Sequence, residues 1–344
     1  MSDLLLEVTR GDLVEERHRG DVAVVDRSGA LVSGCGDPDG MVAYWRSSAK
    51  PFQAMPLVYT GAAHRFGFDA GDLALCCASH SGEPEHTARV AALLERIGCA
   101  AGDLVCGSHP PLHAASAAAL SAAGQTPTVL HSNCSGKHTG MLALARHMGA
   151  PIAGYTASDH PVQQEILENV SRFTGVRRDR IVIGVDGCGA PTFGISVTAM
   201  AAAFARLADP TNMEEPYASA AVRVRDAMVA YPYLVAGTGR FDTAVMTIAP
   251  GLLVAKGGAS GVQCVGLVAG LGFATKLEAG PRQPGLASAV ILGALEQLGC
   301  LDAEQLAALA EYARPAVTNV AGARVGETRV VFAVAQGVAS VPAT

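Results

Sequence analysis

The chain has 344 residues, of which half are hydrophobic and 16% are charged, and its net charge is −6. This length and composition are typical of a folded globular protein with one large domain or two lobes, and they exclude a disordered chain. No run of lysines or arginines is present, which argues against binding to nucleic acid or to a membrane surface.

The ends of the chain carry strand patterns. Alternating and β-branched residues predict three short N-terminal strands, joined by turns at Gly11 and Gly20, and one strand near the C-terminus: residues 4–9, 14–18, 21–26 and 328–336. We expect these terminal strands to lie side by side in one antiparallel sheet.

The middle of the chain is mostly helical. Periodicity and end signals predict helices over residues 85–98, 137–148, 158–170 and 302–313, with Gly149 just past the end of the second. In the third, Asp159 is the expected N-cap and Pro161 lies in the first turn. Residues 207–216 are expected to form a loop. The expected fold is α/β, with a sheet lobe of about residues 1–45 and 240–344 and a helical lobe of about residues 46–239.

The expected cellular setting is the cytoplasm. The N-terminal stretch MSDLLLEVTRGD lacks the basic and apolar regions of a signal peptide. No apolar stretch approaches the length of about 20 residues that crosses a membrane. Nine cysteines form an odd set, which argues against a disulfide framework, so most of them are expected to be buried thiols.

The stretch WRSSAKPFQAM contains Ser47 and Lys50, three residues apart, immediately before Pro51. Proline is tolerated only in the first turn of a helix, so we expect a helix that begins near Ser47 and is kinked at Pro56. Positions three apart share a helix face, and the positive end of a helix favours a neutral lysine that can accept the serine proton. A capped surface helix with a solvated lysine is the alternative.

Two other segments carry side chains suited to the same chemistry. The stretch LLVAKGGASG predicts a strand with Lys256 before two glycines, as in the K-T-G strand that accompanies S-x-x-K in β-lactamase-type enzymes. The stretch CCASHSGEPEH predicts an apolar strand that ends at Ser79, a candidate second hydroxyl beside Lys256. A strand-end lysine before a bulge and a packed serine are the alternatives.

Two polar loops contain one cysteine each. Cys134 lies in HSNCSGKHTGML at an expected helix start, and Cys188 lies in GVDGCGAPTFG after the expected strand RIVIGV. Two thiolates, one nitrogen ligand and a water would complete a tetrahedral Zn²⁺ site. On spacing alone, His138 is the nitrogen ligand that we would choose.

Taken together, these segments resemble the L-asparaginase II family of the thermolabile, rhizobial type. The matching segments follow the order of the family: YWRSSAKPFQ, CCASHSGE, HSNCSGKHTGML, SDHPVQQ, DGCGAPTF, GTGRFDT, KGGASG and GFATKLEAGPR. Each is modest alone, whereas their joint order is specific.

The resemblance implies a β-lactamase-like or serine-glutaminase-like fold, usually dimeric, that hydrolyses L-asparagine to L-aspartate and ammonia without an organic cofactor. It implies two serine–lysine pairs, which fall on Ser47 with Lys50 and on Ser79 with Lys256. It also implies a zinc ion that orients the substrate. The implied zinc ligands are Cys134, Lys137 and Cys188, so that Lys137 replaces His138 as the nitrogen ligand.

In the mechanism that we infer, Ser47 attacks the side-chain amide carbon and neutral Lys50 accepts the serine proton. Backbone amides at the helix start, together with Ser79, stabilise the oxyanion. Two positions depart from the family, which tends to have a hydroxyl residue where Gly257 stands and an acidic residue where Ser260 stands. The second departure is expected to change substrate preference or activity.

The substrate itself needs partners for its charged groups. Arg46 is the candidate for the α-carboxylate, and Asp186 or Glu83 is the candidate for the α-ammonium, because a buried cation requires an anion. Asn133 is expected to bridge these groups. Three alternatives remain: a glutaminase, a β-lactamase-like or peptidase-like serine hydrolase, and a non-catalytic relative that binds an amino acid or zinc.

Overall fold

The computed structural model describes residues 1–280 and 285–334, which cluster into two compact units. Unit 1 comprises Met1–Ser48, Gly194–Asn212 and the described residues from Ala244 onward, and unit 2 comprises Ala49–Phe193 and Met213–Thr243. Residues 194–212, which the sequence-based division assigned to the helical lobe, thus cluster with unit 1.

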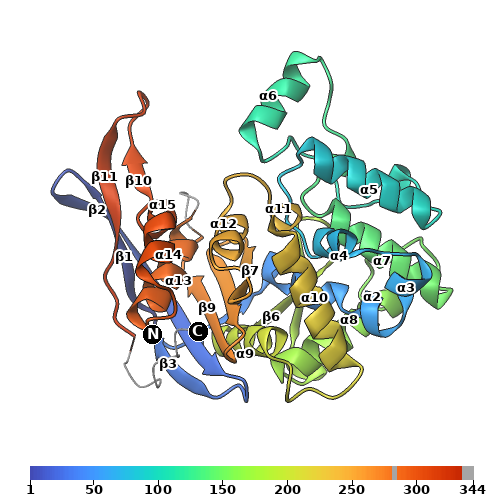
Figure 1. Cartoon of the computed structure of the whole chain (residues 1–344), viewed down its shortest axis with the longest axis horizontal. Helices are drawn as coiled ribbons and strands as arrows, with labels where there is room; N and C mark the ends of the chain where they lie inside the picture. The colour runs from blue at the N-terminus through green and yellow to red at the C-terminus, as the bar shows by residue number, and fades with distance from the viewer. Residues whose placement is uncertain (281–284, 335–344) are drawn as a thin grey trace. The chain divides into compact units, whose positions relative to one another are not determined.

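Unit 1 is built on an antiparallel sheet with the strand order β10-β11-β1-β2-β9-β8-β7, and β3 also pairs with β2 (Figure 1). These strands are β1 (Asp3–Arg10), β2 (Leu13–Asp26), β3 (Leu31–Cys35), β7 (Leu253–Gly258), β8 (Val262–Leu267), β9 (Leu271–Leu277), β10 (Ala316–Thr318) and β11 (Arg324–Val330). The N-terminal β1 pairs with the C-terminal β11, with Leu6 opposite Val330. The predicted α/β fold with a sheet from both ends of the chain is confirmed. The expected last strand ends at Val330, and Gln336 lies outside the described residues.

The prediction of a turn at Gly20 is wrong. Strand β2 runs without interruption through Gly20, which pairs with Asp3 on one side and Leu277 on the other. A side chain at Gly20 would overlap the backbone oxygen of Lys276. Gly20 is therefore needed because two strands approach closely there. An isolated glycine in a strand pattern can indicate such an approach as well as a turn.

Two helices cover opposite faces of this sheet, α9 (Val197–Ala208) and α13 (Leu286–Gln297). Gly266 in β8 faces α9, because a side chain at that position would overlap the backbone oxygen of Phe204. Gln263, three residues earlier and so on the other face, lies against Ser288 of α13. Both faces of the sheet are thus buried, which explains why every residue of β8, including the polar Gln263, is buried.

The contact between β9 and α9 gives a stability prediction. A methyl group at Gly272 would overlap the backbone oxygen of Ala201, and neither backbone can move aside easily. We expect Gly272→Ala to lower the free energy of unfolding by about 3 kcal/mol in guanidinium titrations. Gly102→Ala is the matched control, because nothing lies within 4 Å of its added methyl group. Equal stabilities for the two variants would contradict this packing.

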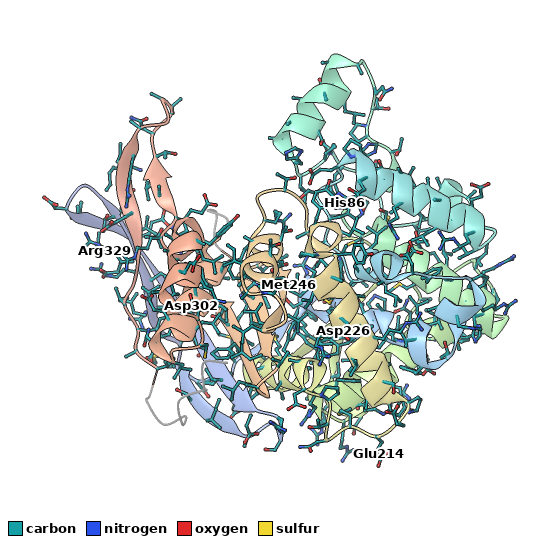
Figure 2. All side chains as sticks on the ribbon, viewed as in Figure 1. His86, Glu214, Asp226, Met246, Asp302 and Arg329 are labelled. Atoms are coloured by element: carbon teal, nitrogen blue, oxygen red, sulfur yellow. The ribbon has the colours of Figure 1, made fainter. Side chains whose placement is uncertain are left out.

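The remaining elements of unit 1 are short. Helices α14 (Ala303–Ala308) and α15 (Ala310–Ala313) replace the single predicted helix 302–313, with a break at Leu309. Asp302, labelled in Figure 2, caps α14 through the backbone N–H of Gln305. The short β4 (Val42–Tyr44) pairs with the end of β6 (Pro191–Ser196).

Unit 2 is mainly helical and is centred on α7, whose residues from Ser135 to Ala145 are all buried. Helices α1 to α5 and α8 pack around α7 (Figure 1). Their bounds, with those of the outer elements, are α1 (Lys50–Ala54), α2 (Pro56–Tyr59), α3 (Ala62–Arg65), α4 (Ala70–Cys76), α5 (Pro84–Arg96), α6 (Ala114–Ala122), α7 (Ser135–Met148), α8 (Pro161–Thr174), β5 (Val182–Val185), α10 (Tyr217–Ala230) and α11 (Pro232–Val235); α12 (Phe241–Ile248) begins in this unit.

Three local expectations have different outcomes. The helix near Ser47 is indeed interrupted before Pro56, where α1 ends and α2 begins. The segment LALCC is helical rather than a strand, because Asp69 and Asp72 form a capping box that starts α4. The cap of α8 is His160 rather than Asp159, since the His160 ring accepts the backbone N–H of Val162.

Candidate active site

The segment that carries Ser47 is a short 3₁₀ helix, η1 (Arg46–Ala49), which leads directly into α1. Trp45, just before it, is fully buried and packs edge-on against Phe204 of α9 at 6.3 Å. This contact anchors the start of the segment in unit 1, while Lys50 belongs to unit 2. Ser47 is half-buried, and its hydroxyl makes no hydrogen bond within the described part of unit 1. The pairing of Ser47 with Lys50 stays a prediction.

Lys50 is almost completely buried and lies against Ser79. Its Nζ is 2.9 Å from Ser79 Oγ, 2.6 Å from the oxygen of Ala78 and 3.2 Å from the oxygen of Asn133. We call Lys50 and Ser79 the Lys50–Ser79 pair. Sequence reasoning had paired Ser79 with Lys256 instead, and that pairing stays a prediction, because the two residues belong to different units.

Lys50 Nζ has three partners and no acidic group among them. The backbone oxygens of Ala78 and Asn133 can only accept, whereas the Ser79 hydroxyl can accept from an ammonium or donate to a neutral amine. Burial lowers the pKa of Lys50 because the interior disfavours the ammonium form. A buried lysine whose free electron pair points at a hydroxyl can act as a general base.

Lys256 is the second predicted lysine, and it lies buried on β7 of unit 1. Its Nζ donates to the oxygen of Gly257 at 2.9 Å, and its own backbone oxygen accepts the hydroxyl of Ser48 at 2.8 Å. The sequence analysis missed Ser48, although it stands beside Ser47 in the motif. The Ser48 hydrogen bond ties β7 to η1, so it fixes Lys256 and the predicted nucleophile in the same unit.

Arg46 and Ser260 share an unusual backbone conformation. Both have positive φ angles, +53° and +60°, and they are the two non-glycine residues with positive φ among the described residues. Arg46 Nη1 lies 3.4 Å from Ser260 Oγ. Such conformations cost free energy and are often found at binding sites, which supports a binding role for the Arg46 guanidinium.

The predicted zinc ligands of unit 2 lie together in a buried group that we call the thiol–amine cluster: Cys134, Lys137 and Cys188. Cys134 and Cys188 lie close enough to shift each other's pKa, and Lys137 Nζ donates to Cys188 Sγ at 3.0 Å. Cys134 is the N-cap residue of α7, Lys137 lies in its first turn, and the turn after β5 contributes Cys188.

The charges of the thiol–amine cluster are coupled. The interaction with Cys188, with the nearby ammonium of Lys137, holds the pKa of Cys134 well below its usual value although burial opposes it. The same interaction, together with burial, raises the pKa of Cys188. Burial alone would lower the pKa of Lys137, but the neighbouring sulfur groups outweigh it and raise that pKa. These directions favour a thiolate on Cys134 beside the Lys137 ammonium.

The donor set of the cluster fits a zinc ion in kind. Two thiols and one amine supply soft sulfur and nitrogen donors that Zn²⁺ accepts, and a fourth position would be left for water or substrate. No three histidine, cysteine, aspartate or glutamate side chains within residues 1–280 and 285–334 are arranged to hold a metal. Lys137 is therefore required for such a site, whereas His138 points its Nδ1 at the hydroxyl of Tyr155, 2.7 Å away.

The candidate substrate-binding residues of unit 2 have distinct surroundings. Glu83 accepts the backbone N–H and the hydroxyl of Thr238, both at 2.8 Å, and these bonds lower its pKa although burial opposes them. Glu83 therefore has a structural partner already. Asp186 is half-buried and lies beside Cys188. Asp186 Oδ1 accepts the backbone N–H of Gly187 at 2.9 Å. The backbone oxygen of Asn133 accepts a hydrogen bond from Lys50 Nζ.

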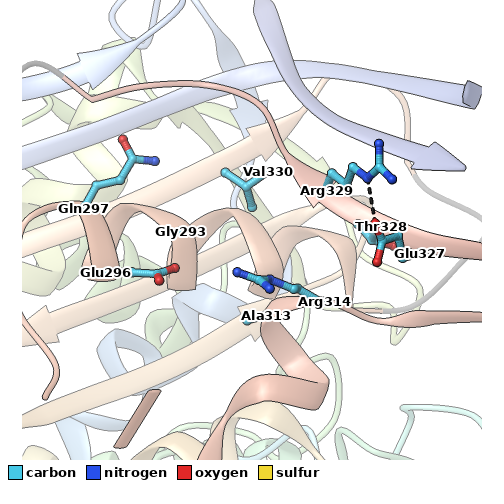
Figure 3. A pocket seen from close by; sticks show the side chains of 9 residues that line it. All are labelled: Gly293, Glu296, Gln297, Ala313, Arg314, Glu327, Thr328, Arg329 and Val330. Carbon is cyan, nitrogen blue, oxygen red and sulfur yellow. Dashed lines mark hydrogen bonds and ion pairs between the residues drawn. The ribbon is translucent and has the colours of Figure 1, made fainter. Parts of the chain in front are cut away.

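Unit 1 contains a cavity of about 420 Å³. It is lined by residues of α13, β11 and the end of α15, and Glu327 and Arg329 form an ion pair of 2.7 Å at its edge (Figure 3). No predicted site residue lines this cavity, so we do not assign the reaction to it.

Two buried histidines beside Ser79 give a prediction for acid stability. Burial lowers the pKa of His80 and of His86 below the usual 6.5. Below about pH 6.5 the unfolded chain binds these protons and the folded chain resists them, so stability falls as the pH decreases. We expect a loss approaching about 1.4 kcal/mol per pH unit for each histidine, measured as guanidinium midpoints between about pH 7 and pH 5. An unchanged slope in His86→Asn would exclude His86 as a contributor.

Comparison with known families identifies the chain. The profile of the L-asparaginase II family matches residues 6–330, which is nearly the whole chain. The chain belongs to the L-asparaginase II family. Membership of this family supports an amidohydrolase activity on a small-molecule substrate. Comparison with curated protein sequences found no significant match.

Solved structures that resemble this member of the L-asparaginase II family are distant. The native form of Mglu is 17% identical, with 84% of this chain and 67% of that chain covered and a TM-score of 0.43. A β-lactamase from Mycobacterium bovis is 14% identical, with 85% and 94% covered and a TM-score of 0.39. At these values the likenesses carry no functional argument. No helix within the described ranges is long and apolar enough to cross a membrane.

Proposed function

We propose that this member of the L-asparaginase II family is an L-asparaginase, which hydrolyses L-asparagine to L-aspartate and ammonia through an acyl-enzyme. The observation that carries the proposal is the buried Lys50–Ser79 pair, with a lysine of lowered pKa against a hydroxyl. Structural lysines are normally paired with carboxylates when buried, and here the partners are a serine and two backbone oxygens.

In the proposed reaction, Ser47 Oγ adds to the side-chain amide carbon while its proton moves to neutral Lys50. The C–N bond then breaks, and the nitrogen takes that proton and leaves as ammonia. Water hydrolyses the aspartyl ester and restores Ser47. Backbone amides and Ser79 stabilise the oxyanion, a contribution of about 3 kcal/mol per donor. The 2.9 Å contact with Lys50 also favours a second assignment, in which Ser79 is the nucleophile.

The proposed substrate contacts pair each charged group of the substrate with a side chain of opposite charge. Arg46, held by Ser260, binds the α-carboxylate. Asp186 or Glu83 binds the α-ammonium, with Asn133 between these groups, because a buried cation requires an anion. Lys256 is proposed to stabilise the substrate or Ser79 as the second catalytic lysine. We also propose that the protein is a homodimer and is located in the cytoplasm.

We also propose that the thiol–amine cluster holds zinc, which would supply a Lewis acid that orients a substrate oxygen. Cys134, Lys137 and Cys188 would be the ligands, and binding must displace the Lys137 proton. The test is metal analysis of the purified protein together with proton release on adding Zn²⁺ to chelated protein. Cys134→Ser should lose both signals, whereas Cys300→Ser, a buried thiol of unit 1, should keep both.

The activity is tested by incubation with L-asparagine and, separately, with L-glutamine, followed by ammonia measurement. We expect faster release from asparagine, and one methylene usually discriminates by about 1–3 kcal/mol. Faster release from glutamine would make the chain a glutaminase. Turnover of a chromogenic β-lactam would favour the β-lactamase-like alternative, and asparagine binding without ammonia would favour a non-catalytic amino-acid-binding protein.

A further inference from the structure

A fully buried histidine, His80, follows Ser79 and has both ring nitrogens engaged. The backbone N–H of Gly82 donates to His80 Nδ1 at 3.2 Å, so the ring proton of the neutral imidazole is on Nε2. Nε2 lies 2.9 Å from Ser135 Oγ, and the Ser135 hydroxyl donates to the oxygen of Leu130 at 3.0 Å. The direction of each hydrogen bond is therefore fixed, from His80 to Ser135 to the backbone.

The His80 ring is also held from the side. It stacks on His86 with 5.0 Å between ring centroids and 12° between planes, and His86 stacks on Tyr233 at 4.8 Å. His86, labelled in Figure 2, accepts from the backbone N–H of Glu83 and lies 3.0 Å from the oxygen of Tyr233. The stack fixes the plane of His80, so its Nε2 has one direction in which to donate.

The hydrogen bond from His80 connects the two parts of the candidate site in unit 2. His80 is the neighbour of Ser79 in the chain, and Ser135 is the neighbour of Cys134. The His80–Ser135 hydrogen bond thus links the residue next to Ser79 with the residue next to Cys134, and so links the Lys50–Ser79 pair with the thiol–amine cluster. Lys50 spans the same two segments, because its Nζ lies 2.9 Å from Ser79 Oγ and 3.2 Å from the backbone oxygen of Asn133.

We propose that His80 is a positioning residue which, through Ser135, sets the spacing between the Lys50–Ser79 pair and the thiol–amine cluster. The inference rests on the proposed function, since it deepens the role of that site. His80 does not contact the substrate in this proposal. It keeps the N-terminus of α7, and with it Cys134, at a fixed distance from the hydroxyl of Ser79.

The test compares variants of His80 that keep the hydrogen bond from Gly82 with variants that keep the hydrogen bond to Ser135. His80→Asn retains an acceptor for Gly82 and loses the bond to Ser135, whereas His80→Gln can still reach Ser135. We expect kcat for asparagine to fall about tenfold in His80→Asn and in Ser135→Ala with KM unchanged, and to be largely rescued in His80→Gln. Thr139→Val, which removes a buried hydrogen bond to the backbone of Ser135, is the control and should keep kcat.

A double-mutant cycle decides between coupling and general damage. The double variant of His80→Asn and Ser135→Ala should lose no more activity than either single variant. Additive losses, losses equal to that of Thr139→Val, or kcat within twofold of the wild type would overturn the proposal. If His80→Asn does not fold, Ser135→Ala compared with Thr139→Val gives the same decision.

A readout without turnover separates this proposal from the proposed function. After chelation, alkylation of Cys134 and Cys188 by iodoacetamide is followed by peptide mass spectrometry. We expect alkylation about fivefold faster in His80→Asn and Ser135→Ala than in the wild type, because a loosened α7 start opens the buried thiols, and no change in Thr139→Val. A wild type without ammonia release but with this pattern refutes the proposed function alone. Equal alkylation rates in all variants refute the positioning role.

Discussion

Replacing Ser47 with alanine is expected to lower kcat for asparagine by about 10⁴-fold or more, because the reaction then lacks its proposed nucleophile. The side chain is half-buried and has no hydrogen bond to lose within the described part of unit 1, so the free energy of unfolding should change by less than about 0.5 kcal/mol. Ammonia release and guanidinium unfolding of the same preparation measure the two effects.

The contact between Lys50 and Ser79 makes Ser79→Ala the necessary comparison. Mass spectrometry of quenched reactions should detect an aspartyl ester on Ser47 in the wild type and in a slow Ser79→Ala variant. An ester on Ser79, or full activity of Ser47→Ala, would exchange the roles of the two serines. The family assignment would survive that outcome, since it rests on the match over residues 6–330.

Local signals in the sequence predicted the elements around the site well. Pro51 and Pro56 each occupy the start of a helix, because proline has no N–H to donate and fits only the first turn. The strand of Lys256 and the antiparallel pairing of the chain ends also follow the pattern of β-branched residues. The errors arose where one residue type is found in two kinds of structure. Glycine is common both in turns and where two strands lie close together, and Gly20 belongs to the second kind.

The partners of the site residues were not predictable in the same way. Ser79 lies 29 positions from Lys50, and no periodicity relates them, because the approach depends on α1 and α4 packing together in unit 2. The segment before Ser79 looked like a strand, since LALCC is apolar throughout, and the capping box of Asp69 was the overlooked helix signal. The thiol–amine cluster needed the family resemblance, because lysine is an unusual zinc ligand and spacing alone favoured His138.

Lys50 gives the second prediction with a large effect, because its role depends on losing a proton. Lys50→Met removes the base and Lys50→Arg keeps a cation that stays protonated at all accessible pH values. We expect both variants to lose activity by about 10³-fold or more. In the wild type, burial lowers the pKa of Lys50 below 10.5. We therefore expect kcat/KM to rise with pH as Lys50 loses its proton, and to reach its plateau at a pH below 10.5.

The lowered pKa of Lys50 also affects the free energy of unfolding, which can be measured independently of activity. Between the lowered pKa and 10.5 the unfolded chain holds a proton on Lys50 that the folded chain has released, so the wild type gains stability as the pH rises through that window. Lys50→Met lacks this contribution. The difference in unfolding free energy between the two proteins should therefore change with pH there, in favour of the wild type. A constant difference would mean that Lys50 stays protonated in the fold, and the three contacts of its Nζ would then be those of a structural ammonium.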